Sequence, residues 1–182
     1  SGLKHTALPT LSARTMEEKC YEAMFAQCNA LESIPSGFLP ANNLAKQCYY
    51  RMFKSCISLE SVSDTLLNAA MTLEHSCYYE MFMGCSSLVN PPELPATTLA
   101  DWCYYGMFDS SGITSFPELP ATTLTERCYS SMFYECSQLP DEIPASMFTY
   151  SLPNGDVAPV KLAPWCYTNM FAESNISVIP AL

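Results

Sequence analysis

Residues 94–108 read LPATTLADWCYYGMF, and both halves of this stretch recur along the chain. The first half, LPATTL, returns unchanged at residues 119–124. The second half holds a Cys-Tyr pair followed, after two further residues, by a Met-Phe pair, and this pattern occurs six times. The leading cysteines are Cys20, Cys48, Cys77, Cys103, Cys128 and Cys166. A chain that repeats one phrase at intervals of 25 to 38 residues is built from structural repeats.

The apolar residues of each copy keep fixed positions when the leading cysteine is numbered 0. Tyr stands at +1, Met at +4, Phe at +5 and Leu or Met at −4. Four copies have a second cysteine at +8, namely Cys28, Cys56, Cys85 and Cys136, and the other two have Ser111 and Ser174 there. At about 100° per residue these positions share one broad face of an α-helix. The pattern therefore predicts one helix in every copy.

Residues on either side of these segments are typical of helix ends. Capping-box spacings occur at residues 15–18, 98–101 and 123–126. Pro95 and Pro120 keep the predicted helices from extending backwards. The run SSLVN at residues 86–90, closed by Pro91 and Pro92, predicts a short strand after the helix. A unit of helix, turn and strand cannot bury its apolar face alone, so the units are predicted to stack as a solenoid.

Composition restricts the partners of the chain. The 182 residues include 8 Lys and Arg against 18 Asp and Glu, a formal net charge of −10. Such a charge repels phosphate backbones and anionic lipid surfaces, so neither nucleic acid nor an anionic membrane is an expected partner. No apolar run approaches the ~20 residues that cross a bilayer, so no membrane span is expected.

The ten cysteines admit three interpretations. Residues eight apart on a helix are separated by about 12 Å, and stacked helices by about 8–10 Å. A disulfide needs Cα atoms within about 7 Å, so this geometry favours buried free thiols that fill the repeat interface. A disulfide at a position beyond the helix end stays open as an alternative. Metal binding has less support, because there is no C-x-x-C pair and His5 and His75 have no ligand spacing.

Aromatic residues also occupy positions that the predicted core does not use. Positions −1, +2 and +6 lie on the outward side of the helical wheel. They carry a candidate ligand-binding stripe of Tyr50, Tyr79, Met83, Trp102, Tyr105, Tyr134 and Trp165. Exposed aromatic patches mark binding surfaces for proteins or sugars. The alternative is that the rings fold over neighbouring turns and cover the crevice between helices.

A second candidate is the insertion at residues 146–160, which lengthens the interval between Cys128 and Cys166. Its Pro153-Asn154-Gly155-Asp156 segment is a turn signal. Long loops on a regular scaffold often carry function, and a tolerated insertion is the alternative.

Enzymatic chemistry has little support in the sequence. The chain has no Gly-rich phosphate loop and no G-x-S-x-G motif. A cysteine nucleophile needs a positioned base, and only two histidines are present. No catalytic residue, cofactor site or metal site is therefore predicted, and the protein is expected not to be an enzyme.

The repeated motif, in the form LPATTL-x3-CY-x2-MF-x2-C-x2-L, resembles the repeats of BspA-like surface proteins of Bacteroides-type bacteria. The resemblance extends roughly over residues 8–182. It implies an α/β fold: a right-handed leucine-rich-repeat solenoid with one short strand and one helix per repeat, about six repeats in all. It also implies export to the cell surface or extracellular space, behind a signal segment absent from this chain. The insertion at 146–160 and the run LLNAAMT at 66–72, which replaces LPATT, depart from the family pattern.

Taken together, residues 1–182 are predicted to form a single solenoid with an irregular insertion. The expected function is a non-enzymatic cell-surface binding or adhesion module for a host or bacterial surface protein or glycan. The alternative is a structural spacer or assembly segment of a larger surface protein, without a dedicated ligand. End-to-end self-association is also considered, because solenoid ends without polar caps expose apolar surface.

Overall fold

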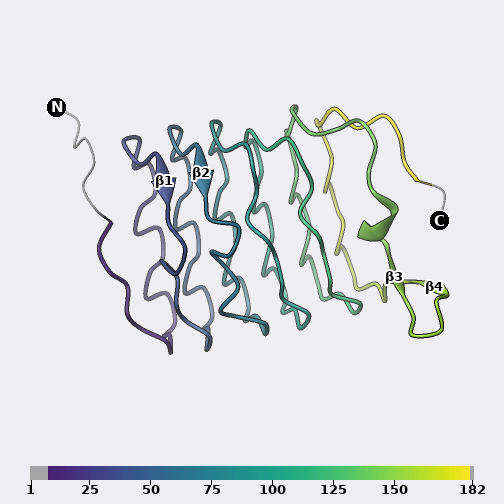
Figure 1. Cartoon of the computed structure of the whole chain (residues 1–182), viewed down its shortest axis with the longest axis horizontal. Helices are drawn as coiled ribbons and strands as arrows, with labels where there is room; N and C mark the ends of the chain where they lie inside the picture. Colours follow the sequence, from purple (N-terminus) through teal and green to yellow (C-terminus); the bar gives the residue numbers. More distant parts are fainter. Residues whose placement is uncertain (1–7, 181–182) are drawn as a thin grey trace.

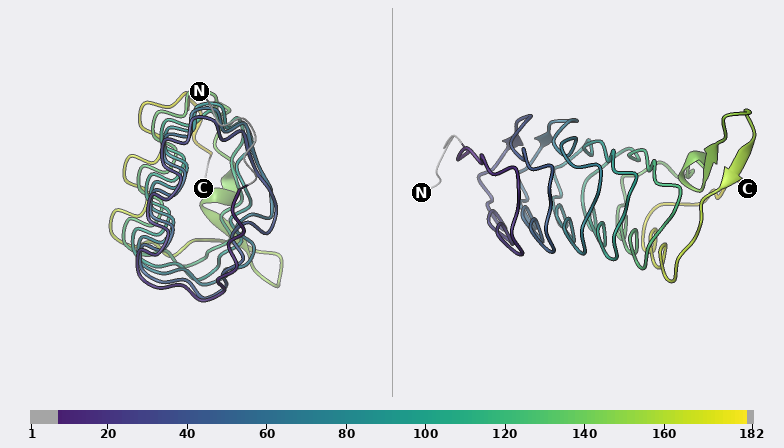
Figure 2. Two further views of the ribbon diagram at one scale, coloured as in Figure 1. Left: turned by 90° about the vertical axis from the view of Figure 1, so that its left-hand side faces the viewer. Right: turned by 90° about the horizontal axis from the view of Figure 1, so that it is seen from below.

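The computed structural model describes residues 8–180, which form a row of stacked coils (Figures 1 and 2). Regular secondary structure is sparse. It consists of strands β1 (Ser33–Ile34), β2 (Ser61–Val62), β3 (Thr149–Ser151) and β4 (Val157–Pro159) and the 3₁₀ helix η1 (Ala145–Met147). Residues 8–180 contain no α-helix. The predicted α/β leucine-rich-repeat solenoid with one helix and one strand per repeat is therefore wrong.

Each predicted helix is instead a curled segment, which we define as positions −1 to +8 of a copy. The six curled segments are residues 19–28, 47–56, 76–85, 102–111, 127–136 and 165–174. In all six, positions −1, +3 and +7 have φ between 48° and 72°, the left-handed region. In the second segment these residues are Gln47, Arg51 and Ser55. A residue with a left-handed φ at every fourth position is incompatible with an α-helix.

Backbone hydrogen bonds in the curled segments alternate between two directions. The amide N–H of Arg51 donates to the carbonyl of Tyr79 in the next copy, at 2.8 Å. The preceding amide bonds within its own copy: the N–H of Tyr50 donates to the carbonyl of Gln47, three residues earlier, at 3.2 Å. Odd-numbered positions thus join neighbouring coils, and even-numbered positions close the curl. The curls follow one another along one side of the solenoid in the end-on view of Figure 2.

The apolar pattern has a period of four residues, which explains why a helix was expected. Positions 0, +1, +4, +5 and +8 place two inward side chains in every curl. On an α-helix a step of four residues rotates by only about 40°, so over three curls both structures use the same apolar positions. The residues at 0, +1, +4 and +5 of the second copy, Cys48, Tyr49, Met52 and Phe53, are at most 1% exposed.

Equivalent side chains stack from coil to coil. Neighbouring Tyr rings at +1 have centroids 5.8–6.0 Å apart, and neighbouring Phe rings at +5 have centroids 5.6–6.0 Å apart. The two rows run through Tyr21, Tyr49, Tyr78, Tyr104, Tyr129 and Tyr167, and through Phe25, Phe53, Phe82, Phe108, Phe133 and Phe171. An aromatic pair contributes about 0.5–1.5 kcal/mol beyond its buried area, so each row reinforces the stacking of the coils.

All ten cysteines are free thiols, and eight of them are buried in this core. The second cysteine of a copy donates from Sγ to a Phe carbonyl of the preceding copy. These bonds are Cys56 to Phe25 (3.0 Å), Cys85 to Phe53 (3.2 Å) and Cys136 to Phe108 (3.0 Å). Free thiols were the favoured interpretation, but the reasoning from helix spacing was wrong, because no helices separate the rows.

The predicted helix caps are also wrong. Their threonines form isolated parallel bridges between coils, which pair Thr15 with Asn43, Thr72 with Thr98 and Thr123 with Lys161. The predicted strand at 86–90 is absent as well. In the two earlier coils the parallel pair of β1 and β2 occupies positions +13 and +14, which correspond to Asn90 and Pro91 in this copy. Pro91 and Pro92 have no N–H to continue a ladder, which accounts for its end there.

The insertion at 146–160 contains part of η1 and the antiparallel hairpin of β3 and β4, with Tyr150 opposite Ala158. The hairpin projects beside the last coils (Figure 1). Its turn is stabilised by the Asn154 side chain, whose amide donates to Asp156 at 2.7 Å. The hydroxyl of Tyr167 donates to the carbonyl of Met147 at 3.1 Å and ties the insertion to the last coil.

Replacement of Ala23 by glycine distinguishes the curl from a helix by the sign of its effect. Ala23 is exposed and has φ of 50°. A left-handed alanine is strained, so Ala23→Gly is expected to stabilise the protein by about 1 kcal/mol. In a helix the same change would destabilise it by about 1 kcal/mol. Urea unfolding of Ala23→Gly, beside the control Ala26→Gly at a position without positive φ, measures the difference. A loss of stability in Ala23→Gly would contradict the curled backbone.

Candidate functional site

Three tyrosines from successive copies stack on the outer side of the curls. Tyr50, Tyr79 and Tyr105 all stand at position +2, and the bonds between coils bring their rings face to face. The ring centroids are 4.6 Å apart for Tyr50 and Tyr79 and 4.7 Å apart for Tyr79 and Tyr105, with interplanar angles of 12° and 10°. All three side chains are half-buried. We call this group the tyrosine ladder.

A tryptophan from position −1 extends the ladder sideways. The Trp102 ring lies 5.2 Å from the Tyr105 ring, tilted by 36°, and 6.3 Å from the Tyr79 ring. Four of the seven residues of the predicted stripe therefore come together in one aromatic cluster.

Charged side chains beneath the ladder neutralise one another. The Arg51 guanidinium lies 4.7 Å from the Tyr50 ring centroid and donates to Glu80 at 2.8 Å. Lys54 donates to the same Glu80 oxygen at 2.7 Å. Burial alone would raise the pKa of Glu80, but the bonds from Lys54 and Arg51 outweigh it and hold that pKa below its ordinary value. The carboxylate is thus ionised and paired at neutral pH.

A second cluster surrounds Arg127. Its guanidinium lies 4.7 Å from the Trp102 ring centroid and 4.9 Å from the Trp165 ring centroid. These three residues all stand at position −1 of successive copies. We call them the indole clamp. Within residues 8–180 Arg127 has no ion-pair partner, and its Nε atom is buried without an acceptor.

The other three residues of the predicted stripe make no ring contact with the cluster of Tyr50, Tyr79, Tyr105 and Trp102 in the described part of the chain. Trp165 reaches the other aromatic residues only through Arg127 in the described part of the chain. Met83 and Tyr134 stand at +6, on a row of their own, and both are half-buried. No ring contact joins Tyr134 to the ladder among residues 8–180. The stripe is therefore two clusters joined at Trp102, with Met83 and Tyr134 beside them.

The helical wheel missed the charged members of both clusters. Arg51 and Glu80 stand at +3, and Lys54 stands at +6. Arg127 could have been found by writing the copies beneath one another, because Trp102 and Trp165 then stand directly before and after it in the same column. The wheel shows one copy at a time and hides such columns.

The buried thiols are poor nucleophiles. Burial raises the pKa of Cys48, Cys56, Cys128 and Cys136 from 9.0 to about 11, and that of Cys85 to about 12. A thiol with such a pKa is almost wholly protonated at neutral pH. Among residues 8–180 no group of three or more His, Cys, Asp or Glu side chains could hold a metal ion.

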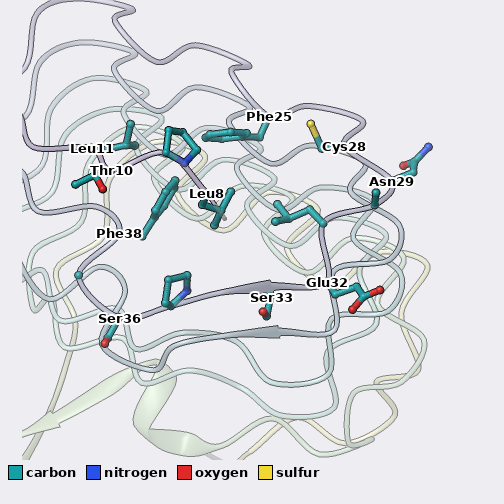
Figure 3. A pocket seen from close by; sticks show the side chains of 15 residues that line it. Leu8, Thr10, Leu11, Phe25, Cys28, Asn29, Glu32, Ser33, Ser36 and Phe38 are labelled. Atoms are coloured by element: carbon teal, nitrogen blue, oxygen red, sulfur yellow. The ribbon is translucent and has the colours of Figure 1, made fainter. Parts of the chain in front are cut away.

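An apolar hollow lies at the first described coils (Figure 3). Its wall includes Leu8, Leu11, Phe25 and Phe38, with Glu32 near its rim. A smaller hollow lies between residues 91–95 and 115–120, and its lining includes five prolines and Phe116. The described lining of the first hollow has one carboxylate, that of Glu32, and the lining of the second has three, those of Asp64, Glu93 and Glu118.

No protein-family model, no curated protein and no solved structure matches this chain. These comparisons give no support to an adhesion role or to a Bacteroides origin, and the leucine-rich repeat with one helix per unit is ruled out by the coils described above. Within residues 8–180 there is no helix long and apolar enough to cross a membrane. The tyrosine ladder and the indole clamp are the features that remain as a candidate site.

Thiol labelling tests the burial of the cysteines. Cys20 and Cys28 are exposed and the other eight are buried. Iodoacetamide at pH 8 is expected to modify these two in the native protein and all ten in the unfolded, unreduced protein. Intact mass with peptide mapping gives the count. Fewer than ten modified residues after unfolding would show a disulfide, and rapid native labelling of Cys77 would show that the core rows are wrongly placed.

The raised thiol pKa values also predict sensitivity to alkali. Unfolded thiols ionise near pH 9.0, and several folded ones only near 11. The contribution of each such thiol to stability is therefore complete below pH 9 and is lost as the pH rises through 11, a loss of about 3 kcal/mol per thiol. Urea unfolding at pH 8 and pH 10.5 is expected to show a marked fall in the midpoint. An unchanged midpoint would contradict the burial of these thiols.

Proposed function

We propose that the protein is a non-enzymatic binding module that presents a surface built by its repeats to a protein or glycan ligand. The observation that carries the proposal is the tyrosine ladder, three half-buried rings at an outward position. The inward rows of Tyr and Phe already supply the core of each coil. Tyrosine is enriched at interfaces because its ring is apolar and its hydroxyl is polar.

Rigidity supports this proposal. The amide N–H of Arg51, directly after Tyr50, donates to the next coil at 2.8 Å, and that of Glu80, directly after Tyr79, does the same at 2.8 Å. The ring-bearing backbone is therefore fixed before any ligand arrives. A preorganised surface loses little conformational entropy on binding, which favours affinity.

The stacking determines what a ligand can touch. Because the ring faces cover one another at 4.6–4.7 Å, a ligand meets ring edges and hydroxyls. Burial and the nearby Glu80 carboxylate raise the pKa of Tyr79, so its hydroxyl keeps its proton and can donate. A narrow row of edges and hydroxyls along the solenoid axis suits an extended ligand, either a peptide strand or a glycan chain.

The same contacts favour a second candidate, a structural spacer without a ligand. Rings that stack on one another contribute to stability as the core rows do. The exported, cell-surface location and the end-to-end association remain predictions from the sequence.

A pair of substitutions separates the two functions. Tyr79→Ala and Tyr105→Ala are expected to reduce binding to a glycan array and to purified extracellular matrix proteins at least tenfold, because each removes central contact area. Glu22→Ala, at the same position of the first copy, is the matched control. Tyr79→Phe keeps the stack and removes one hydroxyl, which separates binding from folding.

Thermal unfolding of each variant accompanies the binding assay. Lost binding with an unchanged melting temperature supports the binding module. Destabilised variants whose binding equals that of the parent protein, or a parent protein that binds no component of either panel, would favour the spacer.

A further inference from the structure

Arg51 and Arg127, the two arginines of the aromatic surface, differ in whether a carboxylate neutralises their charge. Both lie over aromatic rings at 4.7 Å. The Arg51 guanidinium is neutralised by Glu80, whose carboxylate also receives Lys54. Arg127 has no such acid within residues 8–180. Other cations of residues 8–180, such as Lys46 and Lys161, also lack an ion-pair partner, but Arg127 differs from them because it lies between two indole rings with its Nε buried without an acceptor.

The indole clamp also determines which part of the Arg127 guanidinium a ligand can reach. Trp102 and Trp165 approach the guanidinium to 4.7 Å and 4.9 Å. With rings this close, the outer edge of the guanidinium is the part left for hydrogen bonding. That edge carries N–H groups in a planar fork, which matches the two oxygens of a carboxylate. That edge is therefore available to an anion.

Charge restricts the anion to a small one. Asp101 and Glu126 stand at −2, directly before Trp102 and Arg127, and the Asp101 carboxylate accepts the Glu126 amide N–H at 3.0 Å. These acids and the net charge repel a polyanion such as a nucleic acid. A ligand with a single carboxylate gains the arginine and avoids most of that repulsion.

The exposed indole indicates what accompanies the carboxylate. Trp165 is 56% exposed and lies beside Arg127. An indole presents a flat apolar surface to which the C–H face of a sugar ring can pack. We propose that the indole clamp binds a sugar that carries one carboxylate, of the uronic acid type. This inference rests on the proposed binding function and names its ligand class at the neighbouring cluster.

Ligand binding at the indole clamp can be followed by tryptophan fluorescence, because Trp102 and Trp165 are the two tryptophans of the chain. The parent protein is titrated with sodium glucuronate, with glucose and with sodium acetate. Glucuronate is expected to change the tryptophan emission with saturation. Glucose, which has no carboxylate, and acetate, which has no ring, are expected to bind at least tenfold more weakly.

Two variants assign the effect to the guanidinium. Arg127→Gln is expected to weaken glucuronate binding by about 10-fold to 100-fold, since a charge-assisted hydrogen bond is lost. Arg127→Lys keeps the charge without the planar fork. Its affinity for glucuronate is expected to lie between that of the parent protein and that of Arg127→Gln. Arg14→Gln, which changes an exposed arginine outside both clusters, is the matched control and is expected to bind as the parent does. Isothermal calorimetry on each variant with an unchanged melting temperature confirms the fluorescence result.

Several outcomes would overturn the inference. These are no saturable response to glucuronate, equal binding of acetate or of a peptide with a free C-terminal carboxylate, or unchanged binding in Arg127→Gln. If glucuronate fails while the tyrosine variants still abolish binding on the arrays, the proposed function stands and only this ligand is wrong. If glucuronate binds at the clamp while the tyrosine variants change no binding on the arrays, the ladder is structural and the clamp is a separate site.

Discussion

The hydrogen bond from every second amide of a curled segment to a carbonyl of the next copy is the constraint on which the structure depends. Arg51 to Tyr79 is one such bond and Phe53 to Met81 is another. Because these bonds set equivalent residues side by side, each position of the repeat becomes a continuous row. A buried row of Tyr or Phe forms core, and an outward row forms surface. The tyrosine ladder and the indole clamp are rows of the second kind.

The repeat could be predicted from the sequence, and so could most of the buried positions of the inner copies, because two apolar residues recur in every four. In the outer copies Met24 and Leu162 stand at predicted core positions but are exposed. The backbone could not. Side chains at 0, +4 and +8 fit a helix nearly as well as a curl, and Gln47 or Ser55 gives no local sign of a left-handed φ. Gly84 at position +7 and Gly106 at position +3 of other copies were the available signal. The tertiary bonds to the next coil outweigh the strain at the remaining residues.

The aromatic residues of the surface were found for a partly wrong reason. The wheel placed Tyr50, Tyr79 and Tyr105 outside the core, and the structure also has them on the outer side of the curls. It did not separate Tyr134 from the ladder or find Arg127. Those relations exist only between copies, so they follow from the stacking of rows. A surface of this kind is best sought by aligning the repeats column by column.

Hydrogen-bond scalar couplings measured by NMR test the backbone account most directly, because each coupling identifies one donor and one acceptor. The account predicts a coupling from the amide nitrogen of Arg51 to the carbonyl carbon of Tyr79, and from that of Tyr50 to that of Gln47. A coupling from the Arg51 nitrogen to the Gln47 carbonyl, four residues earlier, would show an α-helix. That result would contradict the curled coil and every row derived from it.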